Sequence, residues 1–130
     1  MTYLAIDYGS KHVGFALGDD EIGIASPFRI IENKGPEQLF SQLKTLVKDE
    51  VIDAIVVGMP LLGTSDMRQR TEVEGFVRVL KEHVSIPIHT YDESFTSQEA
   101  QQRLKDTGQK KDHAVAAMVI LQSYFDSQRR

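Results

Sequence analysis

Apolar residues follow two different spacings along the chain, and each spacing predicts one kind of element. Short apolar runs predict strands at 4–6 and, after a turn that contains Gly9, at 13–17. A third extended segment, 22–31, contains Pro27, which favours an edge position or a bend. The run 53–58 is apolar without alternation, as expected for a parallel strand covered on both faces, and the last strand is predicted at 86–93.

Helical spacing appears in the segments between and after these strands. Apolar residues repeat at this spacing from Leu39 to Val47, after Gly35 and Pro36, and again from Val73 to Leu80. Thr96 and Glu99 match a capping box for a third helix that runs to about Thr107, and a last helix is predicted from about Asp112 to Ser127. This order of elements predicts an α/β fold, a mixed five-stranded sheet with helices packed on its faces.

Composition narrows the class of protein. The 130 residues suit a single domain spanning 1–130. The chain has no cysteine, which excludes a disulfide scaffold, a thiolate zinc site and a cysteine nucleophile. No apolar run has membrane-spanning length and the first residues lack a signal-peptide pattern, so we expect a cytoplasmic protein. The net charge of −4 argues against broad non-specific nucleic-acid binding but leaves room for a local basic patch.

Acidic residues stand at the ends of predicted elements. Asp7 ends the first strand, and because a short apolar strand is usually central and buried, its carboxylate is expected at or near the buried interior. Asp92 and Glu93 end the last strand, and Asp112 begins the last helix. If the two strands are parallel neighbours, their carboxyl ends share one edge of the sheet. Carboxylates gathered there would repel one another unless cations bind. Two Mg²⁺ or Mn²⁺ ions about 4 Å apart would suit these ligands and would support attack of water on a phosphodiester.

Each of these residues also has a structural interpretation. Asp7 could close the turn through a hydrogen bond to Gly9 or Ser10, and Asp112 could be an N-cap. Arg68 and Arg70 are predicted in or just before the first turn of the helix after the central strand, where they are either solvated or contact a phosphate backbone. His113 could assist proton transfer or be structural.

Four motifs together resemble a known family. They are residues 5–14 (AIDYGSKHVG), 57–61 (VGMPL), 92–97 (DESFTS) and 111–124, which contains KDHAVAA and ILQSY. These motifs resemble, from end to end, the YqgF family, also called RuvX. That family is similar in fold to ribonuclease H and the RuvC resolvase, and its members have been assigned as Holliday-junction resolvases and as nucleases that mature the 5′ end of 16S ribosomal RNA precursor.

The resemblance implies functions for particular residues. It implies metal ligands at Asp7, at the Asp92–Glu93 pair and at Asp112, with catalytic roles for Asp7, Glu93 and Asp112. Within the pair we favour Glu93, because the last residue of a strand end faces the open site, although a one-residue change of register would favour Asp92. Lys11, Lys110 and Lys111 flank the ligands and are assigned to phosphate contacts. His12 and Ser94 stand where the family usually has arginine.

The sequence therefore predicts a metal-dependent endonuclease that acts on structured RNA in 5′-end maturation of 16S ribosomal RNA precursor. The first alternative is a Holliday junction resolvase on branched DNA, which would need a dimer. Because no strong self-association element is visible, we expect a monomer or a weak homodimer. A non-catalytic RNA-binding or ribosome-assembly module is a further alternative. Nucleotide binding is the last, since residues 7–11 also resemble the phosphate loop of actin and the sugar kinases, but those proteins close two domains around the nucleotide.

Overall fold

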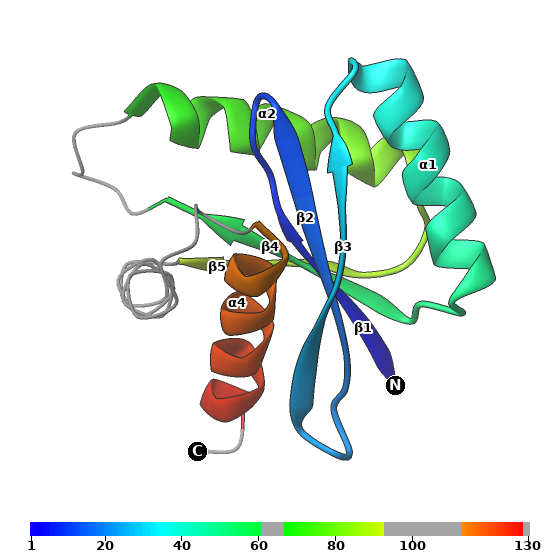
Figure 1. Cartoon of the computed structure of the whole chain (residues 1–130), viewed down its shortest axis with the longest axis vertical. Helices are drawn as coiled ribbons and strands as arrows, with labels where there is room; N and C mark the ends of the chain where they lie inside the picture. The colour runs from blue at the N-terminus through cyan, green and yellow to red at the C-terminus, as the bar shows by residue number, and fades with distance from the viewer. Residues whose placement is uncertain (61–66, 93–112, 129–130) are drawn as a thin grey trace.

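A five-stranded mixed sheet forms the centre of the computed structural model, which describes residues 1–60, 67–92 and 113–128 (Figure 1). The strand order is β3-β2-β1-β4-β5. The strands are β1 (Thr2–Asp7), β2 (His12–Asp19), β3 (Ile24–Glu32), β4 (Ala54–Met59) and β5 (Ile88–Asp92). The first three form an antiparallel meander, whereas β4 is parallel to both β1 and β5. The predicted α/β class and mixed sheet are thus confirmed.

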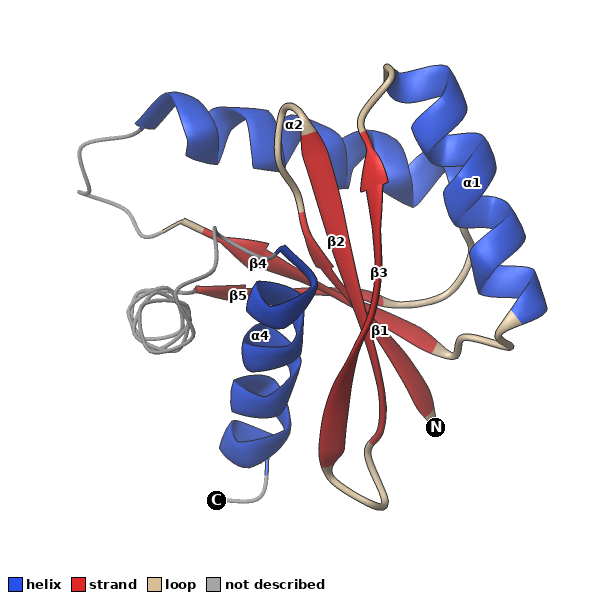
Figure 2. Ribbon diagram, in the orientation of Figure 1, coloured by secondary structure: helices blue, strands red, loops and turns tan. Residues whose placement is uncertain are grey.

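Three helices are described, and they cover the two faces of the sheet (Figure 2). Helices α1 (Pro36–Asp49) and α2 (Met67–His83) pack on one face, in a core that includes Leu4, Ile6 and Phe15. Helix α4 (His113–Gln128) packs on the opposite face against Ala5 and Ala16. Burial of a strand on both faces explains why β4 is an uninterrupted apolar run. The helix predicted from Thr96 to Thr107 lies outside the described residues.

The edge strand β3 carries the bend that its proline predicted. The register between β2 and β3 shifts between Phe15 and Ala16, where Phe28 is the extra residue beside Pro27. Proline cannot donate a ladder hydrogen bond, so a bulge on an edge strand accommodates it.

The sequence left open whether the strands that end in Asp7 and Asp92 are parallel neighbours. The strands that end in Asp7 and Asp92 are parallel, but they are not neighbours, because β4 lies between them. Chain order does not determine strand order once a crossover connection is made. The carboxyl ends of all three parallel strands still lie at one edge of the sheet, which is where sheets of this class place their sites.

No described helix combines the length and the apolar character that crossing a membrane would require.

Candidate active site at the carboxyl edge of the sheet

Asp7 lies at the carboxyl end of β1 with only 6% of its surface exposed. It is the one buried charged side chain in the part of the chain that the structure describes. A buried carboxylate needs a compensating partner or a cation, because burial removes the water that would otherwise solvate its charge. The predicted burial of Asp7 is therefore confirmed, and its partner defines the site.

That partner is His113, the first residue of α4. Its Nδ1 atom lies 2.8 Å from Oδ2 of Asp7. Because a carboxylate can only accept a hydrogen bond, His113 donates from Nδ1. Among the described residues, the second carboxylate oxygen, Oδ1, has no hydrogen-bond partner. The histidine thus fixes the orientation of the Asp7 carboxylate and leaves one oxygen for another ligand.

Gly14 of β2 allows this contact between two distant parts of the chain. It pairs with Asp7 in the antiparallel ladder. A Cβ atom at Gly14 would lie 2.1 Å from the carbonyl carbon of His113, closer than nonbonded atoms approach. A glycine within a strand often marks such a close approach of another backbone. The start of α4 therefore reaches Asp7 because β2 has no side chain at this position.

The turn after Asp7 is held by Asn33, which lies between β3 and α1. The Asn33 side chain donates from Nδ2 to the carbonyl oxygen of Gly9 at 3.0 Å and accepts from the backbone N–H of Gly35 at 3.2 Å. Its own backbone N–H donates to the carbonyl oxygen of Lys11 at 2.8 Å. These bonds fix the turn that carries Lys11, whose side chain is exposed.

Asp92 lies on the other face of the sheet from Asp7. Its Oδ1 atom is 3.6 Å from Nη1 of Arg70, which belongs to α2, whereas the preceding Tyr91 packs its ring against Tyr124 of α4. Successive side chains of a strand point to opposite faces, so both contacts agree. Among the described residues, Asp92 is paired with Arg70 and not brought to Asp7.

Arg70 makes two further contacts near the ends of the strands. Its Nε atom donates to Oε1 of Glu74 at 3.1 Å, and Nη1 donates to the carbonyl oxygen of Pro60. Only 16% of the Arg70 side chain is exposed. Its guanidinium thus connects the first turns of α2 to the ends of β4 and β5. Arg68, two positions earlier in the same helix, is exposed to solvent.

Four of the predicted site residues, Glu93, Lys110, Lys111 and Asp112, lie outside the described residues. Within the described ranges, no group of three histidine or acidic side chains is arranged to hold a metal ion. Asp7 alone of the described candidates offers a buried carboxylate with an unbonded oxygen. Such a hard oxygen donor fits Mg²⁺ or Mn²⁺.

Two contacts at this candidate site were not predicted from the sequence. The His113–Asp7 bond joins residues 106 positions apart, and nothing in the local pattern of either residue indicates it. Asn33 was also not identified. The unusual glycine within the second strand, Gly14, was the available signal that another element approaches there.

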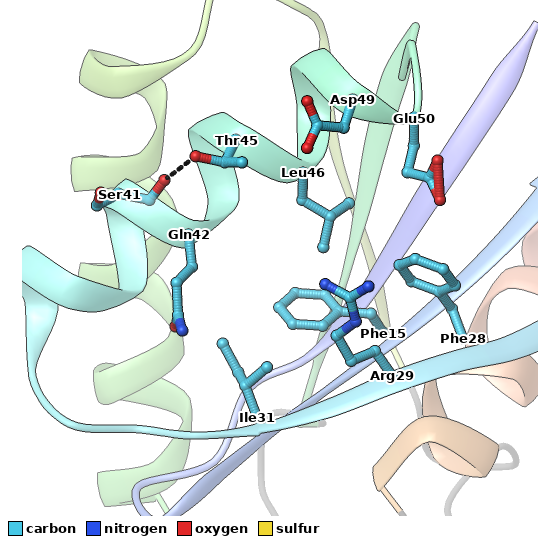
Figure 3. Close-up of a pocket in the computed structure, with 10 residues that line it drawn as sticks. All are labelled: Phe15, Phe28, Arg29, Ile31, Ser41, Gln42, Thr45, Leu46, Asp49 and Glu50. Atoms are coloured by element: carbon cyan, nitrogen blue, oxygen red, sulfur yellow. Dashed lines mark hydrogen bonds between the residues drawn. The ribbon is translucent and has the colours of Figure 1, made fainter.

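A separate hollow lies between β3 and α1 (Figure 3). It encloses about 420 Å³ and is lined by residues such as Phe15, Arg29 and Thr45. None of the predicted site residues lines it, so the hollow is separate from the carboxyl edge of the sheet.

Solved structures share this arrangement of elements. The chain matches "T. thermophilus RuvC in complex with Holliday junction substrate" with a TM-score of 0.67 at 16% identity, over 99% of this chain and 96% of that one. It also matches the fowlpox virus resolvase bound to Holliday junction DNA, with a TM-score of 0.57 at 11% identity and full coverage of both chains. The fold is therefore that of the ribonuclease H-like resolvases.

Sequence comparison is more specific. The model of the RuvX family, described as "Holliday junction resolvase", matches residues 1–127. A protein of Maridesulfovibrio salexigens is 33% identical over 96% of this chain and 98% of its own length, and one of Dictyoglomus thermophilum is 37% identical over 98% and 96%. Both are named "Putative pre-16S rRNA nuclease". The chain belongs to the RuvX family, a family of nucleases, and the predicted resemblance is confirmed.

Proposed function

We propose that this chain is a divalent-metal-dependent endonuclease that hydrolyses phosphodiesters in 5′-end maturation of 16S ribosomal RNA precursor. The observation that carries the proposal is the buried Asp7 carboxylate, held through Oδ2 by His113, at the carboxyl edge of a resolvase-type sheet. The names of the relatives at 33–37% identity support ribosomal RNA as the substrate.

Asp7, Glu93 and Asp112 would hold the metal, which we take to be two Mg²⁺ or Mn²⁺ ions. When bound, such ions supply a lowered pKa for an attacking water and stabilise charge on the leaving oxygen. Strand alternation supports Glu93, rather than Asp92, as the ligand on the same face as Asp7, because Asp92 is paired with Arg70 on the opposite face.

The other residues near the edge orient the reactants. His113 keeps the Asp7 carboxylate in one orientation by donating from Nδ1. Asn33 fixes the turn from which Lys11 would contact a phosphate. We assign Arg68, Lys110 and Lys111 to further phosphate contacts. Arg70 holds Asp92 and the Pro60 carbonyl, so it would contact a phosphate only through N–H groups that these partners do not use.

A second candidate function is resolution of Holliday junctions. The family description and the match to a junction-bound RuvC favour it. Paired cuts in a junction need two sites related by symmetry. We propose that the chain is a single domain over 1–130 that acts in the cytoplasm as a monomer or weak homodimer. Because resolution of a junction needs a dimer, a monomeric state would favour RNA over the DNA junction as the substrate.

Cleavage of two labelled substrates tests this choice. Precursor 16S RNA and a four-way DNA junction are incubated with the protein and Mg²⁺ or Mn²⁺. We expect metal-dependent cutting of the RNA at a defined position near the 5′ end of the mature sequence and slower cutting of the junction. Preferential, symmetric cutting of the junction would instead establish the second function. Binding of RNA with no cutting of either substrate would support a non-catalytic ribosome-assembly module.

A further inference from the structure

A small hollow between α1 and α2 opens beside the turn that follows Asp7. It encloses about 210 Å³, and its lining includes Tyr8, Asn33, Phe40 and Phe76. Sites for drug-sized ligands usually enclose about 300–1,000 Å³. The hollow therefore has room for one ring system and not for a larger ligand.

The lining is mainly aromatic. The ring of Tyr8 stacks on Phe76 with 4.5 Å between centroids, and Phe76 stacks on Phe40 at 5.5 Å. Phe40 and Phe76 are buried, whereas Tyr8 is half-buried. The polar members of the lining are Tyr8 and Asn33, and the Asn33 amide already bonds to Gly9 and Gly35. An apolar slot with a few polar groups is typical of a site for a planar, partly polar ring.

Packing does not explain why a glycine occupies position 75. It occupies the middle of α2, where glycine makes a helix less stable than alanine does. A Cβ atom at Gly75 would have nothing within 4 Å, so no neighbour requires glycine there. Gly75 lines the hollow, and a side chain at this position would project into space that is now open. The glycine weakens the helix and keeps the hollow accessible.

The hollow lies close to the candidate active site along the chain, but on the opposite face of the sheet. Tyr8 directly follows Asp7, and Asn33 both lines the hollow and holds the carbonyl of Gly9. The side chains of Asp7 and Tyr8 contact opposite faces of the sheet, through His113 of α4 and Phe76 of α2. A strand that crosses the edge of the sheet would therefore meet the carboxylate on one side and the hollow on the other.

A second hollow of about 340 Å³ extends this surface between α1 and α2, where the C-terminal end of α2 lies beside α1 (Figure 1). Both hollows share Pro36, Phe40 and Val79. The second hollow is also lined by three exposed residues that can carry charge, the acidic Glu37 and the basic Lys44 and His83. A cation beyond an aromatic slot matches the backbone phosphate of a nucleotide whose base occupies the slot.

We propose that the hollow beside Tyr8 binds one unpaired nucleobase of the substrate, in a nucleotide that flanks the phosphate held at Asp7. The inference rests on the proposed nuclease function and adds a contact to a base. Phe76 and Phe40 are each stacked between two neighbouring rings, so the base would stack on the outer face of Tyr8. Stacking of a base on an aromatic side chain contributes about 1–3 kcal/mol and tolerates any base. The slot thus selects for an unpaired nucleotide at one position rather than for a sequence.

Filling the slot tests the proposal. Binding of a single-stranded oligoribonucleotide is measured for wild type, Gly75→Ala and Gly75→Leu, with Ca²⁺ in place of Mg²⁺ so that the RNA stays intact. 2-Aminopurine replaces one base at a time, and its fluorescence falls where the base stacks. We expect quenching at one position in wild type, and Gly75→Leu should abolish that quenching and weaken binding by about 5- to 100-fold.

Two controls separate the slot from general effects. Thr45→Leu places the same leucine side chain at an exposed helical position in the hollow between β3 and α1, which Figure 3 shows. This variant should bind RNA like wild type. Gly75→Ala should raise the melting temperature and weaken RNA binding slightly. If Gly75→Leu fails to fold, the RNA affinity and quenching of Gly75→Ala test the proposal. Equal binding and quenching in wild type and both Gly75 variants would overturn the inference and leave the hollow for a protein partner.

The outcome also separates this inference from the proposed function. Wild type that cleaves precursor RNA and Gly75 variants that bind and cleave it equally well would refute the base slot alone. A wild-type protein that neither binds nor cleaves RNA would refute both.

Discussion

The Nδ1 atom of His113 and the Oδ2 atom of Asp7 lie 2.8 Å apart, although 106 positions separate the two residues in the chain. The bond joins the end of β1 to the start of α4 and satisfies one oxygen of the only buried carboxylate among the described residues. It makes His113 a positioning residue for the proposed metal ligand Asp7.

Replacing His113 should therefore weaken metal binding without unfolding the protein. His113→Ala removes the Nδ1 donor, and loss of a partner that orients a metal ligand usually reduces metal affinity or activity about 10- to 100-fold. We expect a fall of this size in Mn²⁺ affinity, measured by calorimetry, and in kcat for RNA cleavage. The far-ultraviolet circular dichroism should be unchanged.

His12→Ala is the matched control for that variant. His12 is exposed, and its ring lies 6.2 Å from the ring of His113 rather than against Asp7. Its removal should leave Mn²⁺ affinity within a factor of about two, below the range expected for a supporting residue. If His12→Ala and His113→Ala were equally impaired, the specific role of the Asp7 bond would be refuted.

Two glycine-to-alanine substitutions should have opposite effects on stability. At Gly14 the new Cβ would lie 2.1 Å from the backbone of His113, so α4 has to move away from β2. Overpacking of this kind costs about 1–3 kcal/mol, and Gly14→Ala should lower the melting temperature and reduce cleavage. Gly75→Ala meets open space in α2 and should raise the melting temperature. Thermal denaturation of both variants measures this, and a Gly14→Ala protein as stable and active as wild type would contradict the packing described.

Arg68 and Arg70 should separate into a binding residue and a structural residue. Arg70 has 16% of its side chain exposed and contacts Glu74, Asp92 and the Pro60 carbonyl, so Arg70→Met should cost roughly 1–3 kcal/mol of unfolding free energy. Arg68→Met removes an exposed cation and should leave stability unchanged.

The same pair differs in its effect on RNA binding. If Arg68 contacts a phosphate, its loss should reduce the slope of log affinity against log salt concentration by about 1. Denaturant unfolding and RNA binding at several salt concentrations measure both effects. A change of stability in Arg68→Met, or of salt slope in Arg70→Met alone, would reverse the assignment.

Much of the fold follows from the sequence because its strands and helices have distinct periodicities. The continuous apolar run of β4 identified a central parallel strand, and Pro27 identified the edge strand and its bend. The burial of Asp7 followed from its place at the end of an apolar strand. The order of strands did not follow, since the sequence of elements does not say that β4 separates β1 from β5.

The site was harder to predict because its contacts are between distant residues. Strand alternation could have placed Asp92 on the face opposite Asp7, but only with the register known to one residue. The bond from His113 to Asp7 depends on how closely α4 packs against β2, and the absence of a side chain at Gly14 allows this close packing. The Asn33 tether likewise joins two turns that come together only in the folded protein.

The central claim is that Asp7 holds a catalytic metal ion. Asp7→Asn tests it most directly, because asparagine keeps an oxygen that can accept the His113 hydrogen bond while removing the charge that binds the cation. We measure Mn²⁺ affinity, RNA affinity and cleavage of labelled precursor 16S RNA for wild type and Asp7→Asn. The account predicts that Asp7→Asn binds the RNA like wild type but loses Mn²⁺ binding and does not cleave. An Asp7→Asn protein that binds Mn²⁺ and cleaves the RNA at the wild-type rate would contradict it.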